Sequence, residues 1–439
     1  MKPRPIVGAA LTGSLLLGLT ACGGTGKPAP WITAPEVFYL RPLGDKSGPS
    51  DKEPFHLRAE DGRGAGSRRL TVDVLGGSED AVRLRGSGGC KGGATHVTCE
   101  VGAQYNNWVD AARVAPVAAK GSKPGDTGVV RFTYSTKDGK KLTARTRFVV
   151  GEPVVEALVP KFLDGVRPGA EVTSPIVVRN TGEVPVKGLG LELSSGGLEF
   201  EERYANCRYP EISHHHTAVC RFPDLRIAPG ETVVLRPALR LRASKTEMYT
   251  SFGRDVWALD MGPGQYGSYT KGGDYGNGPT LVAEVTKDTK GTFAKGGGHT
   301  YVALDTHADY EVSGVDLRGA PGAKRTLRLT VRNNGPADSG SSTQLVFSPP
   351  LGLTLVKQPR EEYDDGVFKP YCDSNGFAYT CDIDVLKPGK SRTFEFTVRL
   401  GEPGEGTVSL LDKDPPGEFV SGRHDPNPSN DEATISVRP

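Results

Sequence analysis

The chain has 439 residues, enough for about three domains of the usual size. Its 58 glycines and 34 prolines stay below the fraction that marks a disordered low-complexity chain, and hydrophobic residues make up 36%. The 54 Lys and Arg residues nearly balance the 52 Asp and Glu residues, so bulk charge gives no reason to expect a nucleic-acid-binding protein.

The N-terminus has the pattern of an export signal. Lys2 and Arg4 precede an apolar run from Ile6 to Leu19, which is too short to cross about 30 Å of hydrocarbon as a helix. The run ends in Leu19-Thr20-Ala21-Cys22, which resembles the bacterial lipobox. This resemblance implies a lipoprotein signal peptide over residues 1–21, cleavage before Cys22 and lipidation of its thiol. An ordinary secretory signal with an incidental cysteine is the alternative.

A lipidated Cys22 predicts where the protein resides. Two or more acyl chains suffice for stable anchoring, and no later stretch offers 18 consecutive apolar residues, so lipid is the expected membrane attachment. Residues 22–35 are the expected lipidated tether. We expect the protein on the extracytoplasmic face of the cell membrane, and its Gly-, Ala- and Arg-rich composition resembles that of actinobacterial surface lipoproteins.

The six remaining cysteines form three close pairs along the chain. An exported chain meets an oxidising environment, and each cysteine has one near neighbour. We therefore predict three disulfides within domains, which are Cys90–Cys99, Cys207–Cys220 and Cys372–Cys381. Zinc is the alternative, but structural zinc sites usually contain C-x2-C knuckles, and the sequence has none.

An internal repeat surrounds the last two cysteine pairs. Each copy has a Pro-Gly-Ala turn, then an Arg-Asn-x-Gly motif at the same offset, and a Pro-Gly dipeptide after the second cysteine. The first copy is more divergent and keeps only its cysteines and Pro124-Gly125. The matching segments are Pro168-Gly169-Ala170 with Pro321-Gly322-Ala323, Arg179-Asn180-Thr181-Gly182 with Arg332-Asn333-Asn334-Gly335, and Pro229-Gly230 with Pro388-Gly389.

The segments between these motifs predict β-strands. Residues 327–331 and 394–400 alternate apolar and polar side chains, and Asp138-Gly139 separates two β-rich runs as in a hairpin. Turn residues recur about every 8 to 12 positions, and no sustained helical periodicity follows the signal peptide. The pattern predicts an all-β fold made of β-sandwiches.

The third copy carries a family resemblance. Four motifs and the pair Cys372…Cys381 occur in order, and their succession resembles the DUF11-type immunoglobulin-like repeats of bacterial surface proteins. The resemblance implies extracellular, non-catalytic modules: three tandem Ig-like sandwiches over residues 36–151 (divergent), 152–298 and 299–439. The motifs are Arg332-Asn333-Asn334-Gly335-Pro336, Pro349-Pro350-Leu351-Gly352-Leu353-Thr354, Leu386-Lys387-Pro388-Gly389 and Asp425-Pro426-Asn427-Pro428-Ser429-Asn430-Asp431.

Catalytic motifs are missing from the sequence. It contains no G-x-S-x-G, H-E-x-x-H, Walker A or dinucleotide fingerprint, so we expect no enzyme, no catalytic residues and no cofactor. The one S-x-x-K, at Ser268-Tyr269-Thr270-Lys271, lies among glycines instead of on the helix that the motif needs.

A Gly- and Tyr-rich loop over residues 262–278 is the expected ligand-binding loop. It contains Tyr266, Tyr269 and Tyr275, and flexible glycine with exposed tyrosine makes an adaptable contact surface. We expect recognition to use this loop and the loops between the cysteines. A plain inserted loop is the alternative.

Two segments are weak metal candidates. His214-His215-His216 lies between two cysteines, but alternate side chains of an extended backbone point oppositely, so an exposed polar loop is favoured. The oxygen-rich segment 425–431 offers a weak calcium candidate, because Ca²⁺ prefers oxygen ligands. Its ligands would be Asp425, Asn427, Asn430 and Asp431, and turn capping by the same side chains is the alternative.

The sequence thus predicts a lipid-anchored extracytoplasmic protein that presents Ig-like modules for non-enzymatic adhesion, binding or cell-envelope scaffolding. The expected partners are the membrane, through the lipid on Cys22, and an unknown cell-wall polymer or surface protein, with no nucleic acid. The alternative is an accessory-domain protein or a hydrolase of envelope polymers with an unrecognised active site. A solute-binding transport lipoprotein would need helices between its strands, which the sequence pattern does not predict.

Overall fold

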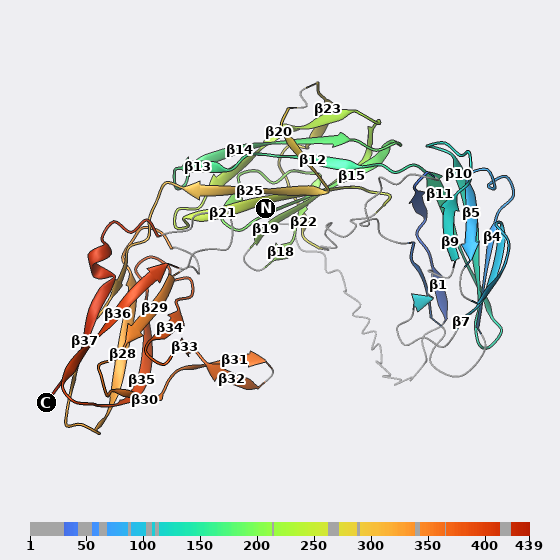
Figure 1. Ribbon diagram of the computed structural model, residues 1–439. Helices are drawn as coiled ribbons and strands as arrows, with labels where there is room; N and C mark the ends of the chain where they lie inside the picture. Colours follow the sequence, from blue (N-terminus) through green and yellow to red (C-terminus); the bar gives the residue numbers. More distant parts are fainter. Residues whose placement is uncertain are drawn as a thin grey trace, which may run out of the picture.

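The computed structural model describes residues 30–42, 55–60, 68–86, 89–101, 108–109, 114–212, 215–261, 272–287, 290–338, 343–364, 366–412 and 423–439. Over these residues every regular element is a β-strand, apart from the short 3-10 turn η2 (Pro428–Asn430). The strands form three sandwiches that follow one another in chain order (Figure 1). The expected all-β class is confirmed.

The first sandwich contains strands β1 to β11. Its larger sheet has the order β2-β11-β10-β4-β7-β6, and the facing strands form the sheets β1-β3-β8 and β5-β9. Since β1 pairs with β3, the sandwich begins at Trp31, inside the segment expected to be tether. The strands are β1 (Trp31–Thr33), β2 (Val37–Leu40), β3 (Leu57–Glu60), β4 (Arg68–Val74), β5 (Val82–Gly86), β6 (Cys90–Gly92), β7 (His96–Val101), β8 (Trp108–Val109), β9 (Val114–Ala118), β10 (Thr127–Ser135) and β11 (Lys141–Val150).

The second sandwich contains β12 to β25. The sheet β16-β20-β14-β12-β24, with β23 beside β20, faces the sheet β13-β25-β21-β15-β19-β17-β22, with β18 beside β19. The strands are β12 (Val155–Val159), β13 (Leu163–Val166), β14 (Glu171–Asn180), β15 (Val186–Ser195), β16 (Leu198–Phe200), β17 (Cys207–Tyr209), β18 (Glu211–Ile212), β19 (His215–Ile227), β20 (Thr232–Ala243), β21 (Tyr249–Ala258), β22 (Asp274–Tyr275), β23 (Val282–Val285), β24 (Thr292–Lys295) and β25 (Gly297–Leu304).

The third sandwich contains β26 to β37. The sheet β26-β28-β35-β30 faces the sheet β27-β37-β36-β29-β34-β33, and β31 and β32 form a separate hairpin. The strands are β26 (Tyr310–Val312), β27 (Val315–Arg318), β28 (Lys324–Asn333), β29 (Thr343–Ser348), β30 (Thr354–Lys357), β31 (Arg360–Asp364), β32 (Val367–Pro370), β33 (Cys372–Ser374), β34 (Tyr379–Asp382), β35 (Ser391–Arg399), β36 (Gly404–Asp412) and β37 (Glu432–Arg438).

One strand order is common to the three sandwiches. In each larger sheet an edge strand pairs in parallel with the last long strand, as β2 does with β11, β13 with β25 and β27 with β37. The opposite side of the sheet carries a short antiparallel hairpin, β6-β7, β17-β19 or β33-β34. The first sandwich, which the sequence marks as divergent, therefore shares the strand order of its larger sheet with the other two.

This layout is that of a variable-type Ig sandwich, in which two additional strands extend the sheet that contains the last strands. The chain path between them differs, because β5, β16 and β30 join the facing sheet before the hairpin forms. The hairpin therefore attaches to the sheet through its second strand.

The three predicted disulfides are confirmed, and each lies across one of these hairpins. The bonded cysteines are direct partners in the antiparallel register, Cys90 with Cys99, Cys207 with Cys220 and Cys372 with Cys381. Antibody domains use their disulfide to join the two sheets, whereas these bridges join neighbouring strands of one sheet. Three such bridges are typical of an extracellular protein.

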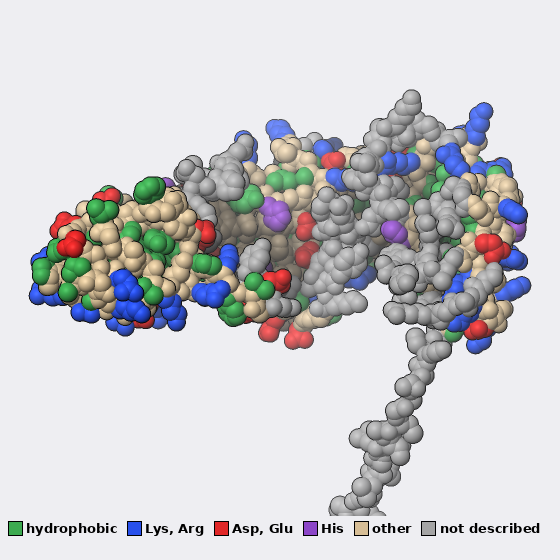
Figure 2. Space-filling view, turned by 60° about the horizontal axis from the view of Figure 1, so that its bottom comes forward, with side chains coloured by type: hydrophobic (Ala, Val, Ile, Leu, Met, Phe, Trp, Pro, Cys, Tyr) green, Lys and Arg blue, Asp and Glu red, His purple; other side chains and the backbone are tan. Residues whose placement is uncertain are grey.

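Alternating side chains build a separate core in each sandwich. In β28, Leu327, Leu329 and Val331 are buried, whereas Arg328 between them is exposed. Each sandwich has its own large apolar cluster, and charged side chains of both signs are spread over the outer surface (Figure 2). Period-two alternation is the sequence signal that predicted these strands, so that prediction is confirmed.

The repeated Arg-Asn-x-Gly motif holds a buried amide in the second sandwich. Asn180 is fully buried, and its Nδ2 donates to the carbonyls of Val184 and Ile227 at 2.9 and 3.0 Å. Its Oδ1 accepts from the N–H groups of Gly182 and Val154 at 2.9 and 3.3 Å. All four hydrogen-bonding positions of the amide are thus occupied.

Asn333 occupies the same place in the third sandwich. Its Nδ2 donates to the carbonyls of Ala337 and Leu386 at 2.8 and 2.7 Å, and its Oδ1 accepts from Gly335 N–H at 2.9 Å. Its backbone carbonyl accepts from Gly389 N–H at 2.7 Å, so the motif lies directly against the repeated Pro-Gly turn. A Cβ on Gly335 would lie 2.3 Å from a backbone nitrogen, which explains the glycine.

A small apolar cluster joins the first and second sandwiches. Tyr39 and Val149 pack with Val184, and the Tyr39 hydroxyl donates to Asp260 Oδ2 at 2.7 Å. Burial and the Asp260 carboxylate raise the pKa of Tyr39 well above its ordinary value. Gly151 has φ 86°, and a Cβ there would lie 2.9 Å from a Val184 methyl group, so the linker needs glycine at this point.

A side chain from the second sandwich lies in the core of the third. Met248 is 1% exposed and belongs to the apolar cluster of the third sandwich. Beside it, Asp338 N–H donates to the carbonyl of Thr246 at 2.8 Å, and the Tyr249 hydroxyl lies 2.9 Å from His424 Nε2. The segment before β21 is therefore part of the joint.

Strand β25 crosses the division that the sequence places between residues 298 and 299. It pairs with β21 and ends at Leu304, and β26 begins at Tyr310, so the second sandwich includes the whole strand. The glycine run 296–298 resembles a linker, but a Cβ on Gly297 would lie 1.9 Å from the carbonyl oxygen of Arg254. These glycines allow close packing inside a sheet.

Replacing Asn333 by alanine should destabilise the third sandwich by about 2–4 kcal/mol, because three buried backbone groups lose a hydrogen bond from this side chain. Calorimetry of the full chain, with hydrogen exchange at Gly389, would measure the effect. The control is Asn334→Ala, which removes an exposed side chain and should change stability by less than about 0.5 kcal/mol. Equal effects of both variants would contradict this role.

Candidate functional site

The expected ligand loop lies beside the disulfide hairpin of the second sandwich. Tyr266, Tyr269 and the motif from Ser268 to Lys271 lie outside the described residues. Tyr275 is in β22, which pairs with β17, so that Tyr275 lies opposite Arg208. The Tyr275 side chain is 64% exposed. The structure thus brings together the two regions that were expected to take part in recognition.

Glycine in this half of the loop serves close packing. The N–H of Gly276 donates to the Cys207 carbonyl at 3.1 Å, and a Cβ on Gly276 would lie 2.2 Å from the Arg203 carbonyl oxygen. Gly273 is equally constrained, since its Cβ would lie 2.4 Å from Pro210 N. The expectation of flexible glycine therefore does not describe this half of the loop.

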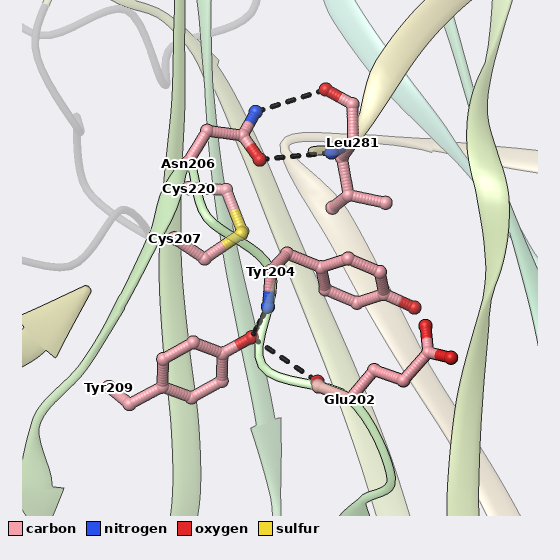
Figure 3. Close-up of a disulfide and its surroundings, with 7 residues drawn as sticks. All are labelled: Glu202, Tyr204, Asn206, Cys207, Tyr209, Cys220 and Leu281. Atoms are coloured by element: carbon pink, nitrogen blue, oxygen red, sulfur yellow. Dashed lines mark hydrogen bonds between the residues drawn. A yellow bond between two sulfur atoms is a disulfide. The ribbon is translucent and has the colours of Figure 1, made fainter. Parts of the chain in front are cut away.

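An asparagine side chain ties the end of the loop to the hairpin (Figure 3). Asn206 Nδ2 donates to the Leu281 carbonyl, and its Oδ1 accepts from Leu281 N–H, both at 3.0 Å. This pair of bonds imitates one step of a β-ladder. Asn206 precedes Cys207, so the disulfide and the returning chain share one anchor.

Two tyrosines flank the disulfide-bonded Cys207 along the chain and are joined by a hydrogen bond. The Tyr209 hydroxyl accepts from Tyr204 N–H at 2.6 Å and donates to the Glu202 carbonyl at 3.4 Å (Figure 3). Arg203 stacks over the Tyr209 ring at 4.5 Å, and Phe200 meets that ring edge to face. Burial raises the pKa of Tyr209 to about 12, so the hydroxyl keeps its proton.

The resulting site is a braced outer strand with one exposed aromatic ring. It offers a contact surface of backbone groups and Tyr275, with the cationic side chain of Arg208 bonded to the Gly272 carbonyl at 2.8 Å. Such a surface suits binding to a polymer or a protein, because aromatic rings supply large contact area at small entropic cost.

The histidine segment does not assemble a metal site in the described structure. His214 lies outside the described residues, and His215 and His216 are exposed at the start of β19. Within the described ranges, no group of three or more His, Cys, Asp or Glu side chains is placed to hold a metal ion.

The calcium candidate is corrected by the structure. The acidic side chains do converge, but they surround the guanidinium of Arg423, which is 4% exposed. Arg423 binds both oxygens of Asp431 at 2.6 and 2.8 Å, Asp412 at 2.7 Å and Asp425 at 3.3 Å. An arginine already supplies the cation that calcium was expected to provide.

The amide side chains of this segment bond to other side chains of the third sandwich. Asn427 Oδ1 accepts from the Ser429 hydroxyl at 2.7 Å, and Asn430 Nδ2 donates to Asp309 at 2.8 Å. Turn capping, the alternative that the sequence left open, is made here by Asp425, whose Oδ1 accepts from Asn427 N–H at 2.8 Å. The sequence analysis missed Arg423, because a lone arginine forms no motif. Of its partners, only Asp425 lies close to it in the sequence, whereas Asp412 and Asp431 are further away.

A carboxylate pair on β15 and β21 also went unpredicted. Glu192 and Asp255 are direct cross-strand partners on the second sandwich. Burial, with Asp255 nearby, raises the pKa of Glu192 to about 7, and its Oε2 is buried without a hydrogen bond. Strand alternation alone could place both residues on one face, but register is needed to place them opposite each other.

Comparisons with known proteins give no family. No family model and no curated protein matches the chain. Similar solved structures are an ectodomain fragment of ICAM-5 (TM-score 0.21, 11% identity, 93% of this chain and 76% of that chain), a variant of BcpA, the major pilin subunit of Bacillus cereus (0.20, 9%, 93% and 99%), and a protein of unknown function from Porphyromonas gingivalis (0.16, 13%, 64% and 98%). These likenesses are distant, so the fold is defined by the chain's own sheets.

In the part of the chain that the structure describes, no helix has the length and apolar character needed to span a membrane.

Replacing Arg423 by methionine should destabilise the third sandwich by about 3–5 kcal/mol, because buried carboxylates lose their cation. Millimolar CaCl2 should leave the melting temperature of the wild type unchanged. The control is Arg438→Met, which breaks an exposed pair with Asp316 and should cost at most about 1 kcal/mol. A clear calcium-dependent rise in the wild-type melting temperature would restore the calcium hypothesis.

Replacing Glu192 by glutamine should stabilise the protein most at alkaline pH. The folded state raises the pKa of Glu192 from 4.5 to about 7, so it binds this proton more tightly than the unfolded chain does. The contribution of Glu192 to the free energy of unfolding therefore falls as the pH rises between these values. Thermal melts at pH 4.5 and pH 8 test this, with exposed Glu199→Gln as control. An identical pH dependence for both variants would refute it.

Proposed function

We propose that this protein is a lipid-anchored extracytoplasmic protein whose three Ig-like modules serve adhesion, binding or cell-envelope scaffolding, without catalysis. The lipid on Cys22 would attach it to the membrane, and a cell-wall polymer or surface protein would be its partner. The lipobox that ends at Cys22 supports the lipid anchor.

The buried joints between the sandwiches are the observation that carries this proposal. Tyr39 is hydrogen-bonded to Asp260 at one joint, and Met248 fills part of the next core at the other. Modules that are joined by buried contacts keep a fixed arrangement in a row. A spacer or a display arm needs such an arrangement. The exposed Tyr275 at a braced sheet edge supports a binding role for the middle module.

The organisation of the buried polar groups also supports binding over chemistry. The carboxylates around Arg423 are neutralised, and the buried asparagine amides have their hydrogen bonds satisfied within the fold. These groups stabilise turns and strand ends.

Membrane release of a Cys22→Ser variant tests the anchor in cells. The variant should move from the membrane fraction to the soluble fraction, because it lacks the thiol that accepts the lipid. Thr25→Ser, which lies three residues further on, should stay with the membrane. Purified wild-type protein should in addition cosediment with isolated cell-wall sacculi. Unchanged fractionation would end the lipid-anchor proposal, and absence from the sacculi would end the proposal of a wall partner.

A further inference from the structure

Three exposed cations gather on the outer face of the third sandwich. Lys324 on β28 lies directly opposite Arg399 on β35, and Lys357 on β30 lies opposite Thr397, one step along the same face. All three side chains are exposed, and we call them the basic corner. Like charges placed directly opposite each other destabilise a strand pair. The corner therefore costs stability.

The equivalent place in the second sandwich is charge-balanced. There Glu171 lies opposite Arg242, and Arg242 NH1 donates to the Gly169 carbonyl at 3.0 Å. Arg399 NH1 makes the same bond to the Gly322 carbonyl, at 3.3 Å, and Gly322 is the repeat counterpart of Gly169. The two rungs are thus the same structural position in two copies of one module.

Carboxylates surround this rung in the second sandwich. Arg240 binds both oxygens of Glu171 at 2.8 and 2.6 Å, and Arg242 forms an ion pair with Glu201. On the neighbouring strand β16, Glu199 lies opposite Arg242. In the second sandwich, Arg240 and Arg242 therefore each have an anionic partner.

The third sandwich lacks these carboxylates. Lys324 replaces Glu171, and on the neighbouring strand Thr354 lies opposite Arg399 where the second sandwich has Glu199. Among the described residues, none of the three cations of the basic corner forms an ion pair, although exposed Glu402 follows Arg399 in the next turn. Three cations therefore face solvent where the sister module neutralises its own.

The position and flatness of the basic corner indicate its ligand. It lies at the end of the third sandwich away from the joint, where β28 begins, and Lys and Arg side chains gather along the lower edge of this body in Figure 2. A flat sheet face does not enclose a small anion, so several weak contacts to one chain must act together. Exposed Thr326 adds a hydroxyl donor beside the cations.

We propose that the basic corner binds a linear polymer whose repeating charges are phosphate groups. The guanidinium of Arg399 can hold two phosphate oxygens at once, and the ammonium groups of Lys324 and Lys357 bind as point charges. Cations on three adjacent strands about 4.8 Å apart match charges repeated along a chain. The proposal rests on the binding role proposed above and names the chemistry of the partner.

A charge reversal at Lys324 tests the proposal on the full chain. Fluorescein-labelled inorganic polyphosphate is titrated with wild type, with Lys324→Glu and with Lys390→Glu. Lys324→Glu should weaken binding at least tenfold while the melting temperature stays equal or rises, because it recreates the Glu171–Arg242 pairing of the sister module. Lys390→Glu makes the same change of net charge in the exposed turn at the other end of the sandwich, and should weaken binding less than twofold.

Two further ligands decide the chemical class. Wild type should bind polyphosphate at least tenfold more tightly than poly-L-glutamate of equal length or vesicles of phosphatidylglycerol, and all binding should weaken with salt. Equal losses in both variants would assign binding to net charge, and preference for the carboxylate polymer or the vesicles would overturn the phosphate-polymer proposal. Failure here leaves membrane release and sacculus binding unchanged, so it is distinguishable from failure of the proposed function.

Discussion

The buried asparagine amide of the repeat is the constraint on which the second and third sandwiches depend. In the second and third sandwiches it links the end of one strand, the following turn and a carbonyl that precedes the Pro-Gly turn. Buried carbonyls need donors, and a primary amide with its donors and acceptors in one plane can satisfy several of them at once. Asn180 and Asn333 thereby set where β14 and β28 end and how the next sheet begins.

The asparagine amides fix the ends of the strands, and the disulfides stabilise the edges of the large sheets. Each bridge lies across the outermost hairpin of a large sheet, where the backbone has fewer neighbours. In the second sandwich that hairpin also carries β22, so the bridge and Asn206 together support the strand that exposes Tyr275. Stability and recognition therefore meet at the edge of the sheet, while the core between the sheets needs no covalent bond.

Much of the architecture could be predicted from the sequence, because the signals were local. Alternation placed Leu327, Leu329 and Val331 in a core, and the close cysteine pairs predicted the three disulfides. The boundary placed between residues 298 and 299 was wrong, because β25 continues across it to Leu304 and its pairing with β21 is not visible in local composition. The role of Arg423 and the contrast between the two repeat rungs depend on register and on long-range contacts, which composition does not encode.

The parallel pairing of the first and last strands of the large sheets has a mechanical consequence. Where tension enters through β27 and leaves through β37, it acts along two neighbouring strands that run in the same direction. Their hydrogen bonds lie across the direction of pull and must break together, whereas an antiparallel hairpin pulled at its ends opens one bond at a time. The same geometry recurs at β2 with β11 and at β13 with β25. A chain of such units resists stretching at each step, which suits an object held at one end and pulled at the other.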